Sequence, residues 1–401
     1  MESASTGRRS SATPSSSLAS WSTTCTGRPP AHREATVAQT LRIAAVGDLM
    51  LGDQPTCFGF GVRSRYSTSH YEGLVADPAV RDAIREADVA IGNLECAYNN
   101  DTPMAFDTHW HCTDEGALEY LAGLGFDALV VANNHVLERG AKGLEDLKGA
   151  MTRHHIEPIG LGDPLRIERH GKTVAFVAYT AVPDPKNPDV LGVWHDAALD
   201  LVRDLAAETE AVVVCMHWGN ELVECPSTRQ VELGRALVDA GARLVLGAHP
   251  HVLHPVERYK DALIAYSLGN FVFDSFVPDT LRSAVFSFEL DLGAGDINYE
   301  ALPVVTSPRD FHVERADPAT ADAILKRLQA PIDPLPEDEY RARVWRQRRV
   351  YRKAVLRHFA HNILHYKNRC AMTRWAVRRA ALIFRHGKRE RENPDEVYRW
   401  R

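Results

Sequence analysis

Six short apolar runs, each followed directly by polar side chains, constrain the fold of this sequence more than any other feature. Buried strands of a parallel sheet are continuous Val, Ile and Leu runs, and ligands bind just beyond their carboxyl ends. We therefore expect an α/β fold in which six strand ends of one sheet converge. The runs are Ile43–Val46, Val89–Ile91, Leu129–Ala132, Val212–Met216, Leu244–Leu246 and Leu263–Tyr266.

The residues after these runs carry carboxylate, amide and imidazole groups. Such mixed nitrogen and oxygen donors suit Mn²⁺, Fe or Zn²⁺, whereas Mg²⁺ and Ca²⁺ prefer oxygen alone. His249 and His251 form the strongest pair, because alternate residues of an extended segment point to the same side. The pattern predicts a metal site built from Asp48, Asn93, Glu95, Asn134, His135, His217, His249, His251 and Asn270.

Segments with helical spacing lie between the predicted strands, as crossover connections in a parallel sheet require. They are Glu115–Leu124, Gly143–His154 and Arg229–Ala240. A second His-x-His, His109 and His111, precedes the first of these helices. We favour a substrate-facing or structural loop over a metal site for this pair.

The composition is that of a folded protein, with 401 residues, of which 45% are hydrophobic and 25% charged. This length accommodates one α/β domain of about 250 residues and additional segments. We place that domain at residues 41–310 and a linker with a short helix at 311–340. The seven cysteines are scattered, so neither a disulfide framework nor a zinc knuckle is expected.

Residues 1–40 are rich in Ser, Thr and Pro and have few large apolar side chains, so we expect them to be disordered. The sequence contains no apolar stretch long enough for a transmembrane helix and no signal-peptide core. We therefore expect a location in the cytoplasm or at the inner face of the membrane.

Residues 341–401 form a separate basic segment. Between residues 341 and 391 there are 17 Lys or Arg and one acidic residue, a charge of +16 that leaves −22 for the rest of a chain whose net charge is −6. Apolar residues recur at three-to-five-residue intervals, which predicts a basic amphipathic helical tail. The tail would dock on an anionic membrane or polymer, or pack on the acidic domain of its own chain. Nucleic acid is an unlikely partner, because no nucleic-acid-binding motif accompanies the charge.

Several motifs together resemble the capsule synthesis protein CapA family, which is associated with poly-γ-glutamate synthesis. The resemblance extends over roughly residues 41 to 310. It implies a layered metallophosphoesterase-like (calcineurin-like) β-sandwich flanked by helices. The motifs are Gly47-Asp48-Leu49-Met50-Leu51-Gly52, Gly92-Asn93-Leu94-Glu95, Ala132-Asn133-Asn134-His135, His217-Trp218-Gly219-Asn220-Glu221, Gly247-Ala248-His249-Pro250-His251 and Tyr266-Ser267-Leu268-Gly269-Asn270-Phe271.

The resemblance implies two divalent metal ions and a role for each residue. Asp48 and His251 would hold the first ion, Asn134, His217 and His249 the second, and the Asn93/Glu95 tip would replace the bridging carboxylate. His135 would be the catalytic acid or a donor to the transition state. Asn270 would orient a metal ligand without binding the ion itself, and Glu221 would lie near the pocket mouth.

The family pattern differs from that of other metallophosphoesterases at two positions. Met50 occupies the place of a metal-binding His, and Asn93 that of the bridging Asp. The resemblance implies a metal-dependent hydrolase of the phosphoesterase type in capsule or poly-γ-glutamate biosynthesis, acting on an anionic polymer or phosphoester with other capsule synthesis subunits. The alternative is a non-catalytic assembly factor that docks on anionic polymer or membrane through its basic tail.

Overall fold

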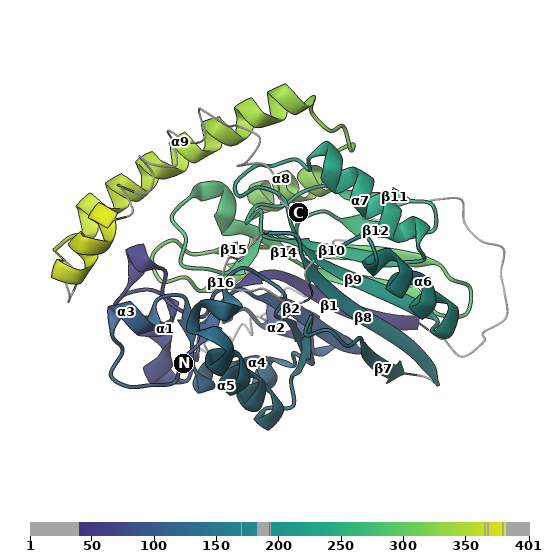
Figure 1. Cartoon of the computed structure of the whole chain (residues 1–401), viewed down its shortest axis with the longest axis horizontal. Helices are drawn as coiled ribbons and strands as arrows, with labels where there is room; N and C mark the ends of the chain where they lie inside the picture. The colour runs from purple at the N-terminus through teal and green to yellow at the C-terminus, as the bar shows by residue number, and fades with distance from the viewer. Residues whose placement is uncertain are drawn as a thin grey trace, which may run out of the picture.

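The computed structural model describes residues 40–169, 171–182, 192, 194–364, 366, 369–378 and 381. The segment predicted to be disordered lies outside these residues except for Thr40, as do residues 382–401 of the predicted tail. Within the described residues, two mixed β-sheets lie face to face and helices cover both outer faces (Figure 1). The predicted α/β class with layered sheets and helices is confirmed.

The first sheet combines parallel strands with an antiparallel extension. In the described part of the chain its order is β16-β15-β14-β1-β2-β5-β6, and β13 also pairs with β1. Strands β1, β2, β5 and β6 are parallel, whereas β14 is antiparallel to β1. The strands are β1 (Thr40–Leu49), β2 (Val89–Leu94), β5 (Ala128–Val130), β6 (Glu157–Ile159), β13 (Asn270–Val272), β14 (Arg282–Asp291), β15 (Ile297–Thr306) and β16 (Val313–Arg315).

The second sheet has parallel strands at its centre and one antiparallel strand at each edge. Its order is β11-β12-β10-β9-β8-β7. The strands are β7 (Leu165–Arg169), β8 (Lys172–Thr180), β9 (Ala211–His217), β10 (Leu244–Ala248), β11 (Val256–Tyr259) and β12 (Ala262–Ala265). A separate parallel pair joins β3 (Ala97–Tyr98) to β4 (Cys112–Thr113).

Three apolar layers hold the sheets and helices together. Side chains of both sheets meet in the middle layer, which includes Phe176, Val213 and Phe286. One outer layer packs α2 (Pro78–Arg85), α4 (Glu115–Leu124) and α5 (Gly140–Arg153) on the first sheet. The other packs α6 (Ala198–Glu208) and α7 (Thr228–Asp239) on the second. The three predicted crossover helices are confirmed as α4, α5 and α7.

All six predicted strands are present, but the expectation that they belong to one sheet is wrong. The runs before Asp48, Asn93 and Asn134 are in the first sheet, as β1, β2 and β5, and the other three are in the second, as β9, β10 and β12. A continuous apolar run predicts a strand that is buried on both faces, but it does not indicate which sheet the strand joins. Face-to-face packing of the two sheets brings both sets of carboxyl ends to the same edge.

A close contact between β1 and β13 fixes the backbone on one side of the region where the carboxyl ends meet. Asp48 pairs in register with Asn93 of β2 and with Asn270 of β13. A Cβ atom at Gly47 would overlap the carbonyl oxygen of Gly269, so only glycine allows the two segments to approach this closely.

The C-terminal part is helical. It contains α8 (Pro318–Leu328), α9 (Glu337–Asn362) and a helical stretch at 369–378. Among the helices of the described residues, none is both apolar enough and long enough to cross a bilayer. The remaining helical segments are η1 (Pro55–Cys57), α1 (Val62–Tyr66), η2 (Ser67–Ser69), α3 (Phe106–His109), η3 (Val136–Arg139) and η4 (Pro278–Leu281).

Candidate metal centre

The strand ends of both sheets bring six predicted residues into one cluster, which we call the central cluster. Its members come from the ends of β1, β2 and β9 and from the loops after β5 and β10, as expected for strands that converge at one edge. The central cluster consists of Asp48, Glu95, Asn134, His217, His249 and His251.

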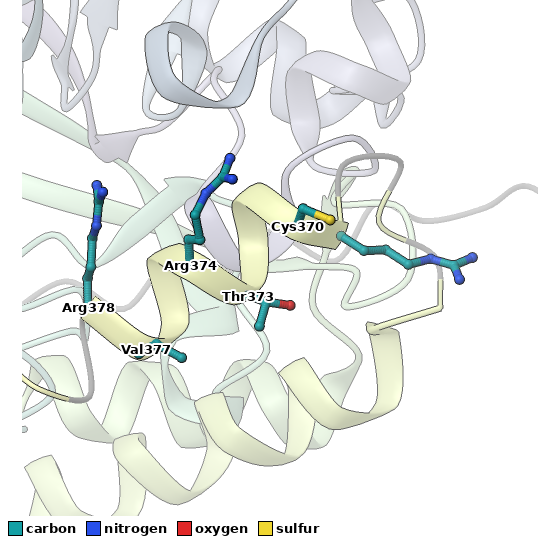
Figure 2. Close-up of a pocket in the computed structure, with 6 residues that line it drawn as sticks. Cys370, Thr373, Arg374, Val377 and Arg378 are labelled. Carbon is teal, nitrogen blue, oxygen red and sulfur yellow. The ribbon is translucent and has the colours of Figure 1, made fainter.

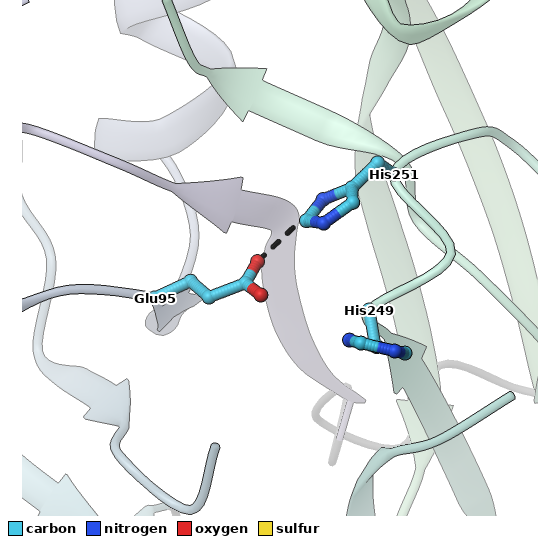
Figure 3. A group of neighbouring side chains, drawn as sticks. All are labelled: Glu95, His249 and His251. Atoms are coloured by element: carbon cyan, nitrogen blue, oxygen red, sulfur yellow. Dashed lines mark ion pairs between the residues drawn. The ribbon is translucent and has the colours of Figure 1, made fainter. Parts of the chain in front are cut away.

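Glu95 lies in the middle of this cluster and its side chain is fully buried. Its Oε2 is 3.6 Å from Nδ1 of His251, and its Oε1 is 3.6 Å from Nε2 of His217. Neither oxygen has a hydrogen-bond partner among the described residues. Figure 3 shows the carboxylate pointing toward His251 and His249, whose ligand atoms lie within 4.8 Å of one another and of Glu95. Glu95 therefore faces two groups of donors, one with each oxygen.

The first group surrounds Nδ1 of His251. This atom is 3.1 Å from Oδ2 of Asp48 and 2.9 Å from Oδ1 of Asn270. The amide nitrogen of Asn270 donates to the carbonyl of Thr280, which fixes the orientation of its oxygen. Asp48, His251 and one oxygen of Glu95 thus converge, and Asn270 also faces the group directly.

The second group surrounds His217. Its Nε2 is 2.7 Å from Oδ1 of Asn134, and its ring centroid is 4.7 Å from that of His249. Nδ1 of His249 is buried and has no hydrogen-bond partner among the described residues. With the second oxygen of Glu95, these residues supply nitrogen and oxygen donors to one small volume.

Asn93 lies behind both groups. Its Nδ2 donates to Oδ1 of Asp48 at 2.8 Å and lies 3.4 Å from Nδ1 of His217. Of the two residues predicted to replace the bridging carboxylate, Glu95 lies between the two groups. Asn93 instead contacts one member of each group, Asp48 and His217.

The loop after β10 differs from the extended segment that we expected for His249 and His251. Both residues have left-handed backbones, with φ of 92° and 59°, and this part of the prediction is wrong. Non-glycine residues adopt this conformation at a cost of about 1–3 kcal/mol, which the surrounding structure must offset. Two strained residues around Pro250 direct both imidazoles toward Glu95.

Burial controls the charge states of His217 and His249, whereas for His251 the lowering by burial is outweighed by the charges of Glu95 and Asp48, which raise its pKa to about 10. Burial lowers the pKa of His249 to about 4 and that of His217 well below its usual value, so both imidazoles are neutral at pH 7. Burial, followed by the charge of Asp48, raises the pKa of Glu95 well above its usual value. Neutral imidazoles are the form that binds metal, and a cation would offset the cost of a charged Glu95.

The buried polar atoms test whether this cluster fits a cation. Both oxygens of Glu95 and Nδ1 of His249 are buried without a hydrogen bond among the described residues. Buried polar atoms are nearly always paired, so such a group of exceptions requires an explanation. The imidazole, amide and carboxylate donors fit a divalent metal ion, and the predicted class of metal stays a prediction.

His135 lies at the rim of the central cluster. Its Nδ1 is 2.8 Å from Oε1 of Glu138, and its Nε2 is 3.9 Å from Oε1 of Glu95. Glu138 was not among the predicted residues, although its position three residues after His135 places both on one helical turn. His111 also contacts Glu138, at 3.1 Å, whereas His109 is buried at the end of α3, with Nε2 bonded to the carbonyl of Asp101.

Glu221 lies in the loop after β9 and is exposed. Its predicted position near the pocket mouth stays a prediction. Phe273, which sequence reasoning missed, packs its ring 4.9 Å from that of His251, and an aromatic residue among many gives no signal in the sequence.

Comparisons with known proteins agree with the motif resemblance. Residues 42–275 match the sequence model of a family described as bacterial capsule synthesis protein PGA_cap. The chain is 30% identical over 307 residues to the PGA biosynthesis protein CapA of Bacillus subtilis (strain 168), a match that covers 72% of this chain and 76% of that protein. It is 31% identical over 284 residues to the capsule biosynthesis protein CapA of Bacillus anthracis, covering 65% of this chain and 66% of that protein.

Solved structures give only a distant likeness. A hypothetical protein from Thermus thermophilus superposes with a TM-score of 0.41 at 16% identity, over 66% of this chain and 99% of that chain. This similarity assigns neither a fold nor a function.

Proposed function

Because this chain belongs to the PGA_cap family of bacterial capsule synthesis proteins, we propose that it acts in capsule or poly-γ-glutamate biosynthesis as a metal-dependent hydrolase of the phosphoesterase type. The observation that carries the proposal is the buried Glu95 carboxylate, whose two oxygens face two separate groups of nitrogen and oxygen donors. This arrangement suits two cations side by side.

The residues divide between two ion positions. Asp48 and His251 would hold one ion, and Asn134, His217 and His249 the other, with Glu95 between them. When bound, a pair of such ions polarises a phosphoryl oxygen and lowers the pKa of water. Glu95 supplies the shared negative charge that the neutral Asn93 lacks.

His135 is the proposed acid for the leaving group. Its Nε2 is directed toward Glu95, and Glu138 holds the ring from the opposite side through Nδ1. A proton on Nε2 would lie next to the reacting atoms, as general acid catalysis requires. Asn270 and Asn93 keep His251, Asp48 and His217 in place, so that the donors need no rearrangement.

The test combines metal content with activity. Wild type and the His249→Ala/His251→Ala variant are loaded with Mn²⁺ or Zn²⁺, freed of excess metal and analysed by mass spectrometry. The same samples are assayed with a generic phosphodiester. We expect wild type to hold about two ions more than the variant and to turn over the substrate, and we expect the variant to lose turnover. His70→Ala, which removes an exposed imidazole far from these residues in the sequence, is the control. Equal metal content in wild type and the double variant would refute the proposal.

A second candidate function is binding of an anionic partner by the C-terminal helices, without catalysis. The inner side of α9 already packs on its own domain. Tyr340 and Val344 contact Val223, and Arg343 forms a 2.8 Å ion pair with Glu224. Attachment to its own chain, one of the alternatives weighed for the tail, therefore accounts for one side of this helix only.

The outer side of α9 favours an anionic partner. It exposes four cations three or four residues apart, which places them on one face over about 16 Å of helix. They are Arg346, Arg349, Lys353 and Arg357. The exposed large apolar side chains of the described residues also lie in this C-terminal part. They are Val350, Leu356, Leu364 and Val377.

The helical stretch at 369–378 extends this surface. Figure 2 shows Arg374 and Arg378 projecting from the same side of the helix. Six residues of this stretch line a shallow hollow of about 550 Å³ whose surface is largely apolar. They are Arg369, Cys370, Thr373, Arg374, Val377 and Arg378. Cations beside exposed apolar groups suit an anionic lipid surface as well as a polymer.

Two variants separate polymer from lipid. In Arg346→Glu/Arg349→Glu/Lys353→Glu, binding to both poly-γ-glutamate and anionic vesicles is expected to fall steeply at low salt. In Leu356→Ser/Leu364→Ser, only vesicle binding is expected to fall, because lipid contact also uses apolar area. Absence of wild-type binding to either partner at low salt would refute this candidate.

A further inference from the structure

A second group of possible metal ligands lies outside the central cluster. It consists of His111, His135 and Glu138, which we call the outer triad, and its ligand atoms lie within 4.8 Å of one another. We propose that the outer triad binds a divalent transition-metal or zinc ion of its own, separate from the ions of the central cluster. This site includes His111, for which the sequence favoured a role other than metal binding.

The contact distances suit a metal site. Oε1 of Glu138 is 2.8 Å from Nδ1 of His135 and 3.1 Å from Nδ1 of His111. Ligands about 2.0–2.1 Å from a zinc ion are about 3.3 Å apart in a tetrahedron, and about 2.9 Å apart in an octahedron. The two observed distances between ligand atoms are close to these values. The rings of His111 and His135 meet edge to face at 4.5 Å, so the imidazoles do not block each other.

Glu138 has an unused ligand atom. Its Oε2 is buried without a hydrogen-bond partner among the described residues. A buried carboxylate oxygen without a partner carries a desolvation cost of about 1–3 kcal/mol or more. A cation bound by both carboxylate oxygens of Glu138 would remove this cost, and the donor set of two imidazoles and one carboxylate is common for zinc.

Backbone hydrogen bonds hold the two histidines in place before any ion arrives. The N–H of His111 donates to the carbonyl of Asp53 at 2.8 Å, and its carbonyl accepts from Ala97 at 2.8 Å, with φ of 54°. The N–H of His135 donates to Oδ1 of Asn133 at 3.0 Å. Two loops far apart in the sequence are thus fixed with their imidazoles on one carboxylate.

Binding of this ion would determine which nitrogen of His135 carries its proton. A neutral imidazole has one N–H, so ligation through Nδ1 leaves the proton on Nε2, the atom 3.9 Å from Glu95. The outer triad would then present His135 to the central cluster as a donor. This consequence rests on the proposed function, whereas the ion site itself does not.

The test counts ions rather than turnover. Wild type, His111→Ala, Glu138→Gln and His249→Ala/His251→Ala are stripped of metal, reloaded with Zn²⁺, freed of excess and analysed by mass spectrometry. Circular dichroism melts check folding, and the isosteric Glu138→Gln is the variant least prone to unfold. His70→Ala is the control for loss of one imidazole.

We expect His111→Ala and Glu138→Gln each to hold one ion fewer than wild type and His70→Ala. The double variant should keep one ion, which is lost when His111→Ala is added. Equal ion content in folded wild type, His111→Ala and Glu138→Gln would overturn the outer site and leave a hydrogen-bonded triad. Full ion content in the double variant would instead refute the central metal centre of the proposed function.

Discussion

The central cluster and α9 differ in how the chain holds them. The cluster lies at the ends of strands whose other residues form the buried layers between and outside the sheets. In α9, by contrast, the buried side chains are those of Tyr340 and Val344, and much of the helix remains in contact with solvent. Chemistry that needs fixed ligand distances requires rigid support such as the buried strands around the central cluster. Binding that tolerates movement can use a partly solvent-exposed helix such as α9.

The largest expected effect comes from Glu95→Gln, which removes the shared charge and keeps the shape. Loss of supporting hydrogen bonds alone weakens metal sites about 10–100-fold, so loss of a central ligand should weaken binding more than about 100-fold. Without metal the same change should raise the melting temperature, because it removes a buried carboxylate whose oxygens have no hydrogen-bond partner among the described residues. Chelator competition and melting in EDTA measure both effects. Unchanged metal affinity would show that Glu95 is not a shared ligand.

A smaller effect is expected on acidification, and it should act on α9. His358 stacks on Phe276 with ring centroids 4.1 Å apart, and its Nε2 bonds to the carbonyl of Thr56 at 3.1 Å. Burial lowers the pKa of His358, and the charge of His361 lowers it further. The undocked helix therefore binds the proton more readily, so docking should weaken as the pH falls through about 6.5 and below.

Hydrogen exchange in α9 at pH 7.5 and 5.5 measures this effect. Exchange should be faster at pH 5.5 after correction for the intrinsic rate, and His358→Gln should remove most of the difference. The core strands serve as an internal reference, because they do not contact His358. A response of the same size in the His358→Gln variant would assign the pH dependence to other groups.

The smallest expected effect is that of Arg343→Ala. The pair between Arg343 and Glu224 is partly exposed, with about a third of each side chain accessible. Such pairs contribute about 0–1 kcal/mol and are screened by salt. Thermal melts at low and high salt should therefore differ little between variant and wild type. A loss of several kcal/mol would mean that α9 is an integral part of the core.

The sequence predicted the strands and crossover helices well, because burial on both faces leaves long apolar runs and because α4 has helical spacing between clear ends. It did not assign strands to sheets, since β1 and β9 carry the same kind of pattern. The residues of the central cluster were predicted from their positions after strands. The left-handed backbones of His249 and His251 depend on tertiary contacts, and spacing alone does not reveal them.

Glu138 illustrates a different limit. An acidic residue three positions after His135 is common on helices, and only the position of His111, supplied by a distant loop, gives it significance. For α9, the basic and apolar residues predicted an amphipathic helix, but which side faces the domain depends on Val223, Glu224 and Phe276 in other loops. Contacts between segments remote in sequence explain most of what the sequence could not predict.

The contact between Asp48 and His251 has a consequence for the order of events during synthesis. These residues are 203 positions apart, and the first emerges from the ribosome long before the second. At about 5–20 residues per second, roughly 10–40 s separate the two. A nascent chain that exposes Asp48 and Glu95 therefore lacks the imidazole of His251, which would complete the first ion position. Loading of the proposed metal centre would therefore follow translation of the second sheet.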